Sequence, residues 1–473
     1  MAEASSALNI MANLPPIQFE LPPVSEEKHS GADLPRVWLG WALLAVIFTA
    51  LIVSSFSAAS GKRILTGEKA EKTQGKMIEM MLSLKALQGK NAPKNEMFTP
   101  YIDELKNDAK KSADAQKLRV ALRTEDGKAP FGDDLKNLAA SSDEQNQAFA
   151  KLYETKDIKK SDAEPYLTKL DGKDLGEKLA KVQFKEKFGD NSIRGKTFPA
   201  EPAMKFGLAG LVGCAGFLAG ILLLAVFTTQ RTAGALKPMG MPQQGVSLPV
   251  ADRLALGASI VMCAYLGLGV AAGTLLKGTP ILAQALPFIG IFVALAIICT
   301  VPIMGYRFSL DSLGVSKNGL GKRILWGIGA YLALLPILLV ALFFVAQLAK
   351  VLPGNAHPVG EEVLGSRGIQ ALGLFLMAAV IAPIWEEIMF RGLLFPALTA
   401  ISKSPVWGAV ISSFLFAAIH PQGPAGVPLL MTLALGMCFI SYQTKSLVPN
   451  IIMHAINNGG ALAMLLLLGK DFF

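Results

Sequence analysis

The sequence predicts an all-α protein, a polytopic bundle of transmembrane helices with a soluble, mainly helical insert near its N-terminus. The first observation is the composition: 52% of the 473 residues are hydrophobic and the mean hydropathy is +0.43, which is typical of a polytopic membrane protein. The second observation is the distribution of charge, because residues 57–205 contain 29 of the 45 Lys and Arg and 24 of the 36 Asp and Glu. Most of the remaining chain consists of apolar runs.

The N-terminal part divides into three segments. Residues 1–36 are polar and contain prolines, so we expect a flexible cytoplasmic tail. Residues 37–56 form an apolar run that is long enough to cross about 30 Å of hydrocarbon, and we expect a transmembrane anchor rather than a cleaved signal peptide. In residues 57–205, apolar residues recur at helical spacing and charges of both signs alternate, which predicts a soluble helical extracytoplasmic insert. Its charge pattern indicates a solvated surface and no nucleic-acid site, so docking of a protein partner is the expected role.

The rest of the chain is predicted to be transmembrane. The boundaries are 206–364 for a first set of helices and 365–470 for a C-terminal core. The apolar runs are 206–227, 254–276, 281–305, 324–348, 369–390, 393–401, 406–419, 427–442 and 447–468. Loops 228–253 and 306–323 carry more Lys and Arg than the loops that follow each of them, which places both in the cytoplasm and residues 57–205 on the opposite side. We therefore expect a multi-pass protein of the cell membrane, in a bacterium the inner membrane.

The stretch "WEEIMFRG" places three charges at the end of an apolar run. A charged side chain at mid-bilayer costs roughly 2.5–3.5 kcal/mol, so such residues rarely occur without a function. On a helix Glu387 and Arg391 share a face and can pair, whereas Glu386 lies about 100° away and is free to act elsewhere. Pro383 is expected to kink the helix. A purely structural ion pair is the alternative, but it leaves the second carboxylate unexplained.

Two of the four histidines, His420 and His454, lie in the apolar C-terminal region, whereas His29 and His357 lie in the tail and in a loop. Phe416 precedes His420 by one helical turn, and Asn458 shares a helical face with His454. A single histidine in an apolar helix is usually a core residue. Two of them near a pair of carboxylates favour metal binding or general-base activation of water, with Asn458 as a donor to an oxyanion.

The order of these motifs resembles the CPBP (CAAX protease or ABI) family of intramembrane endopeptidases, which includes the type II CAAX prenyl endopeptidases. The matching motifs are Glu386-Glu387…Arg391, Phe416…His420 and His454…Asn458, within about residues 365–468. The resemblance implies that Glu386 is the general base, acting with His420 on water, and that His454 and Asn458 stabilise the oxyanion. It also implies membrane lipid and a peptide or protein substrate as partners.

Cofactor use and two rival functions stay open at this point. Glu386, His420 and His454 could hold zinc as two histidines and one carboxylate, but the sequence has no H-E-x-x-H motif, and the metal-free route is favoured. A catalytically silent immunity or scaffold protein would have no evident need for both histidines. A proton-coupled transporter would carry acidic residues on several spans, whereas those in the predicted spans are Glu386 and Glu387.

Overall fold

The computed structural model describes residues 36–59, 67–88, 97–106, 108–110, 112–155, 157–234, 247–275, 319–349, 351–352 and 358–468. Within these ranges the regular structure is helical and contains no strand, which confirms the predicted all-α class. The chain separates into two compact units, one within Met1–Thr66 and Val212–Leu467 and the other within Gly67–Leu211 and Leu468–Phe473. The predicted tail up to residue 35, the apolar run 281–305, His29 and His357 lie outside the described residues.

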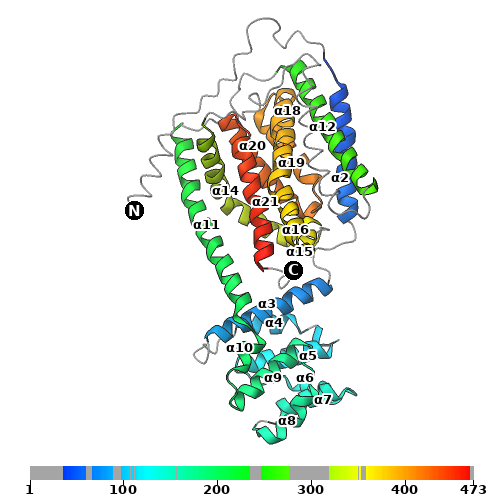
Figure 1. Ribbon diagram of the computed structural model, residues 1–473, viewed down its shortest axis with the longest axis vertical. Coiled ribbons are helices and arrows are strands. Elements are labelled where there is room, and N and C mark those ends of the chain that lie inside the picture. The colour runs from blue at the N-terminus through cyan, green and yellow to red at the C-terminus, as the bar shows by residue number, and fades with distance from the viewer. Residues whose placement is uncertain are drawn as a thin grey trace. The chain divides into compact units, whose positions relative to one another are not determined.

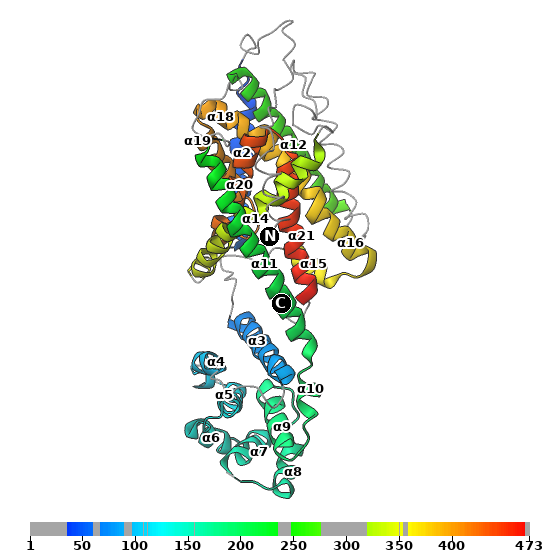
Figure 2. The same cartoon turned by 90° about the vertical axis from the view of Figure 1, so that its left-hand side faces the viewer.

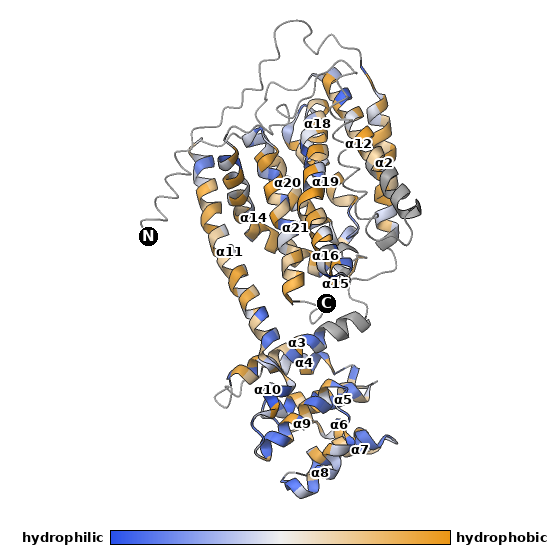
Figure 3. Cartoon of the chain, viewed as in Figure 1, coloured by the Kyte–Doolittle hydropathy of each residue, from blue (hydrophilic) through white to orange (hydrophobic). Residues whose placement is uncertain are grey.

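The unit Gly67–Leu211 is built from short helices around an apolar core (Figure 1). The helices are α3 (Gly67–Gln88), α4 (Thr99–Glu104), η2 (Asp108–Lys110), α5 (Ala113–Glu125), α6 (Gly132–Ala139), α7 (Glu144–Glu154), α8 (Lys160–Lys169), α9 (Leu175–Lys187) and α10 (Ile193–Thr197). Phe98, Leu122 and Phe149 are fully buried in the core. Hydrophilic and hydrophobic residues alternate along these helices (Figure 3), as expected for helices with one buried face.

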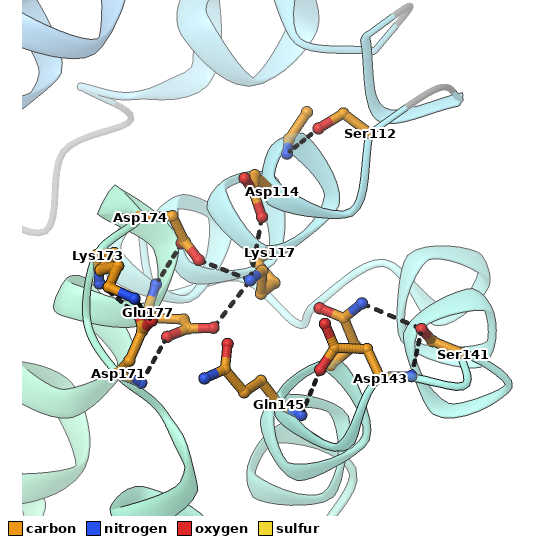
Figure 4. Close-up of polar contacts among 12 residues, drawn as sticks. Ser112, Asp114, Lys117, Ser141, Asp143, Gln145, Asp171, Lys173, Asp174 and Glu177 are labelled. Carbon is orange, nitrogen blue, oxygen red and sulfur yellow. Dashed lines mark hydrogen bonds and ion pairs between the residues drawn. The ribbon is translucent and has the colours of Figure 1, made fainter.

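A buried lysine joins two helices of this unit. Lys117 on α5 donates to Asp174 at 2.6 Å and to Glu177 at 2.8 Å, and it also pairs with Asp114 (Figure 4). Burial alone disfavours the charged amine, but the carboxylates outweigh it and raise the pKa of Lys117 above its usual range. A Cβ on Gly176 would lie 2.6 Å from the Leu118 backbone nitrogen, so only glycine allows this close approach of α9 to α5.

The other unit contains the long apolar helices, which are predominantly hydrophobic in Figure 3. Among the described residues, six helical segments are long and apolar enough to cross a membrane. They are Leu39–Ser57, Ala200–Thr232, Leu320–Leu348, Gln370–Ser402, Pro424–Thr444 and Val448–Leu468. The second of these, α11 (Ala200–Thr232), begins before the expected boundary at 206 and continues from the first unit into this one.

The remaining elements of this unit follow in chain order. They are α2 (Leu39–Ala59), α12 (Leu248–Leu275), α14 (Leu320–Leu348), α15 (Pro358–Gly365), α16 (Gly368–Leu376), η4 (Met377–Ile381), α17 (Ala382–Glu387), η5 (Ile388–Leu394), α18 (Phe395–Ser402), α19 (Pro405–Ala418), η6 (Pro424–Gly426), α20 (Val427–Thr444) and α21 (Val448–Leu468). The helix α19 packs against α18 and α20, and α2 packs along α12 (Figures 1 and 2). Pro405 and the side chain of Ser404, which accepts from the Trp407 N–H, begin α19.

Candidate active site

The carboxylates of the "WEEIMFRG" stretch lie on a short α-helical segment between two π-helical turns. The segment is α17, and the turns are η4 before it and η5 after it. Each π-turn ends two residues before a proline, Pro383 and Pro396 respectively. A proline ring clashes with the carbonyl of the preceding turn, and a π-turn widens the helix where that clash would occur. The sequence predicts a kink at Pro383, and the structure has a π-turn before this proline and a second π-turn before Pro396.

One backbone carbonyl loses its helical partner as a result. The Ala382 N–H donates to the Met377 carbonyl, and Pro383 has no N–H that could reach Ala378. The side-chain nitrogen of Asn458 on α21 donates to the Ala378 carbonyl at 3.1 Å instead. Asn458 therefore joins α21 to the π-turn before Glu386, a role that its position beside His454 in the sequence does not reveal. Its Nδ2 has a second hydrogen for another acceptor.

Glu387 is completely buried and receives two donors on one oxygen. Arg391 Nη1 lies 2.8 Å from Glu387 Oε1, which is the pair expected from the i,i+4 spacing. His454 Nδ1 lies 2.9 Å from the same oxygen, a contact that the sequence did not predict. Arg391 also donates to the Ala434 carbonyl at 3.3 Å and lies over the Phe416 ring. Glu387 thus links the arginine to one of the two histidines.

The orientation of both imidazoles follows from their Nδ1 partners. His420, just after α19, has its Nδ1 2.5 Å from the Phe416 carbonyl, which can only accept, so this nitrogen carries the proton. His454 Nδ1 faces an ionised carboxylate and is protonated for the same reason. Phe416 is fully buried and packs against both rings, with centroid distances of 4.4 Å to His420 and 5.7 Å to His454.

The Nε2 atoms of both histidines face one oxygen of Glu386. Glu386 Oε2 lies 3.9 Å from His420 Nε2 and 3.7 Å from His454 Nε2. This oxygen is buried and has no hydrogen-bond partner among the described residues. Two imidazole nitrogens therefore lie within 4 Å of one carboxylate oxygen, and these separations suit a water molecule that bridges the carboxylate and an imidazole.

A zinc ion is the other species that such a set could hold. Two histidines and one carboxylate have the donor chemistry of catalytic zinc, and each imidazole donates its other N–H as zinc ligands do. However, tetrahedral zinc with bonds of about 2.0–2.2 Å places its ligand atoms about 3.3–3.5 Å apart. Over the residues that the structure describes, no three His, Cys, Asp or Glu side chains are arranged to hold a metal ion. The side chains as placed do not fit the ion.

The structure therefore brings Glu386, Glu387, Arg391, His420 and His454 into one cluster. Asn458 lies next to it on α21, although its described contact is with the backbone of Ala378. One further polar residue contacts this cluster and was not among the candidates from the sequence: Ser55, whose hydroxyl donates to the His420 carbonyl. Nothing in the sequence distinguishes Ser55 from its serine neighbour, Ser54.

A comparison with protein families agrees with the motifs. Residues 368–460 match the family described as type II CAAX prenyl endopeptidase Rce1-like, and this segment is about a fifth of the chain. Among curated proteins and among solved structures, none matches the chain. The matched segment contains all six candidate site residues. The family match confirms the resemblance that the motifs indicated, and residues 368–460 form a domain of the CPBP (CAAX protease) family.

Proposed function

We propose that the protein is an intramembrane endopeptidase of the CAAX-processing type that hydrolyses a peptide bond near the membrane surface. The observation that carries the proposal is that the buried Glu386 Oε2 has no hydrogen-bond partner among the described residues and faces two imidazole nitrogens at 3.7 and 3.9 Å. A water molecule bound between these atoms would have a base on one side and polar partners on the others. The family match supports a membrane endopeptidase, and the geometry supports these residues as its catalytic centre.

In the proposed reaction Glu386 removes a proton from the bound water, which His420 orients through Nε2. The water oxygen attacks the carbonyl carbon of the substrate and the carbonyl oxygen becomes an oxyanion. The protonated Nε2 of His454 and the second Nδ2 hydrogen of Asn458 donate to this oxyanion. When the C–N bond breaks, Glu386 passes its proton to the leaving nitrogen, so that one water is consumed and one acid and one amine are formed.

The proposed protonation of His454 agrees with the charges of the site. Glu386 and Glu387 carry two negative charges and Arg391 carries one positive charge, so one further proton makes the cluster neutral. A neutral cluster is cheaper to bury in the membrane than a charged one. Glu387 contacts His454 directly, so the extra proton on this imidazole lies beside a carboxylate.

The setting of the reaction is proposed from the apolar helices and the charge distribution. The chain is a multi-pass membrane protein with six described helical segments of spanning length. We place it in the cell membrane, with residues 57–205 on the extracytoplasmic side and available to a protein partner. The substrate is a peptide or protein segment at the membrane.

The decisive variant is Glu386→Gln, which keeps the shape of the side chain and removes the base. Two assays use the purified full chain and cells that express it. The first follows cleavage of a farnesylated peptide ending in a Cys-aliphatic-aliphatic-X sequence. The second compares the peptide termini of membrane proteins between cells with the wild type and cells with the variant. Turnover should fall by at least about 10²-fold.

Glu362→Gln is the matched control, because Glu362 is an exposed glutamate on α15. It should cleave like the wild type in both assays. Cleavage by a folded Glu386→Gln protein at the wild-type rate would remove Glu386 from the role of base. Identical membrane termini in all strains, together with an intact peptide, would favour the silent scaffold.

A further inference from the structure

The first apolar helix, α2, lies outside the family-matched segment, yet its N-terminal end is fixed within the same unit. Asp252 on α12 is completely buried and accepts four hydrogen bonds from this end. The donors are Arg36 Nε and Nη2 at 2.5 and 3.1 Å, the Val37 N–H at 2.9 Å and Trp41 Nε1 at 3.0 Å. A buried carboxylate that is fully paired in this way determines where the helix begins.

Along its length α2 packs directly onto the backbone of α12. A Cβ on Gly40 would lie 2.3 Å from the Leu256 nitrogen, so the two helices approach as closely as glycine permits. Ser259 donates to the Gly40 carbonyl at 2.8 Å across this contact. The helix is therefore a fixed part of the bundle and not a separate anchor.

Farther along, α2 contacts the helical segment that carries the carboxylates. Leu44 and Phe48 are each only 4% exposed and belong to the core that contains Trp385, Met389 and Phe390. The rings of Phe48 and Phe390 lie 6.1 Å apart. Phe390 in turn packs edge-to-face on Phe416. The apolar face of α2 thus belongs to the same core as the site.

Near its C-terminal end, α2 makes a polar contact with the site itself. Ser55 is buried, and its hydroxyl donates to the His420 carbonyl at 2.5 Å. His420 lies beyond the end of α19, in a turn, and its carbonyl has one other described donor, the Gly423 N–H at 3.3 Å. Because the imidazole is held by Phe416 through Nδ1, the position of the His420 backbone decides where Nε2 points.

We propose that Ser55 is a positioning residue for His420 and that α2 is a structural part of the peptidase site. The expected loss of turnover rests on the proposed function. The expected change in the position of His420 does not. The hydroxyl of Ser55 holds the turn after α19 so that His420 Nε2 faces Glu386. The site of this chain therefore needs a helix that is separated from the catalytic domain by more than three hundred residues.

The test compares Ser55→Ala with Ser55→Thr, which restores a hydroxyl, and with Ser54→Ala, a change at the exposed neighbouring serine. The full chain is purified with ¹⁵N-labelled histidine. Since the chain has four histidines, their ring nitrogens can be assigned by NMR with His420→Gln and His454→Gln variants. Cleavage of the farnesylated peptide and thermal unfolding are measured on the same samples.

We expect Ser55→Ala to shift the ring-nitrogen signals of His420 and to leave those of His454 unchanged. Its kcat should fall roughly 10-fold with little change in KM, since a misplaced catalytic group costs turnover more than binding. Ser55→Thr should recover part of the loss, and Ser54→Ala should behave as the wild type. An unchanged His420 signal in folded Ser55→Ala would overturn the proposal.

The two proposals fail separately. If wild-type protein leaves both the peptide and the membrane proteins uncleaved, the proposed function fails, while the NMR comparison still decides whether Ser55 positions His420. If Ser55→Ala lowers thermal stability and activity together but His420 keeps its wild-type signals, Ser55 has only a general structural role and the positioning proposal is rejected.

Discussion

Removing one partner of the Glu387–Arg391 pair should destabilise the protein more than removing both. Arg391→Met leaves Glu387 buried with His454 as its remaining described donor, and Glu387→Leu leaves the guanidinium with the Ala434 carbonyl and the face of Phe416. Both side chains are fully buried, and an uncompensated charge at such a position costs roughly 3–5 kcal/mol. The double variant buries no unpaired charge and should recover much of that loss.

The assay is thermal unfolding of the purified full chain in detergent, together with the yield of monodisperse protein. Glu201–Lys205 provides the matched control, since it is also an i,i+4 ion pair but is largely exposed. Its disruption by Glu201→Ala should change the unfolding temperature little, because water replaces the lost partner. If Arg391→Met and Glu387→Leu unfold like the wild type, or if their losses add in the double variant, the pair does not act as a buried structural unit.

Three further predictions concern other parts of the molecule. Asn458→Ala should lower both turnover and unfolding temperature, because the half-buried Ala378 carbonyl loses its donor at a cost of about 1 kcal/mol, and unchanged stability would exclude that role. Burial raises the pKa of Glu125, but Arg194 and Lys85 outweigh it and lower that pKa, so its stabilising contribution is present above about pH 4.3 and is lost as the pH falls through the folded-state value. Glu125→Gln should therefore weaken the acid dependence of unfolding, which a pH series of melting curves measures. Active purified protein should contain much less than one zinc per chain, and stoichiometric zinc that is lost in a His454→Ala variant would reverse the preference for a metal-free route.

The sequence predicts those parts of the site that depend on local spacing. Glu387 and Arg391 are four residues apart, and helical geometry alone places them together. The adjacency of Glu386 and Glu387 also predicts that they point to different partners, since successive residues on a helix are about 100° apart. Composition and apolar runs predict the all-α membrane class for a similar reason, because the length and hydrophobicity of each run can be read from a short stretch of sequence.

The contacts that arise between distant segments could not be predicted. The hydrogen bond from Ser55 to His420 and the contact of His454 with Glu387 depend on how the helices pack, and no local pattern encodes that. The two π-turns were missed for a different reason. A proline such as Pro383 is compatible with a kink, a helix end or a π-turn, and the choice depends on which neighbour satisfies the carbonyl that it leaves unpaired. Here that neighbour is Asn458.

These distant contacts explain how the contacts of Glu387 determine the position of Glu386. Glu387 is completely buried, and its Oε1 accepts from both Arg391 and His454 and so holds them in place. Glu386 is the adjacent residue on the same helical segment. The contacts of Glu387 therefore determine where Glu386 lies relative to His454. The segment is held before the carboxylates by Asn458 at Ala378 and after them by Arg391 at Ala434. The contacts of Glu387 thus fix the segment that carries both carboxylates, and Glu386 Oε2 is left without a hydrogen-bond partner among the described residues, which keeps it available as a base within the membrane.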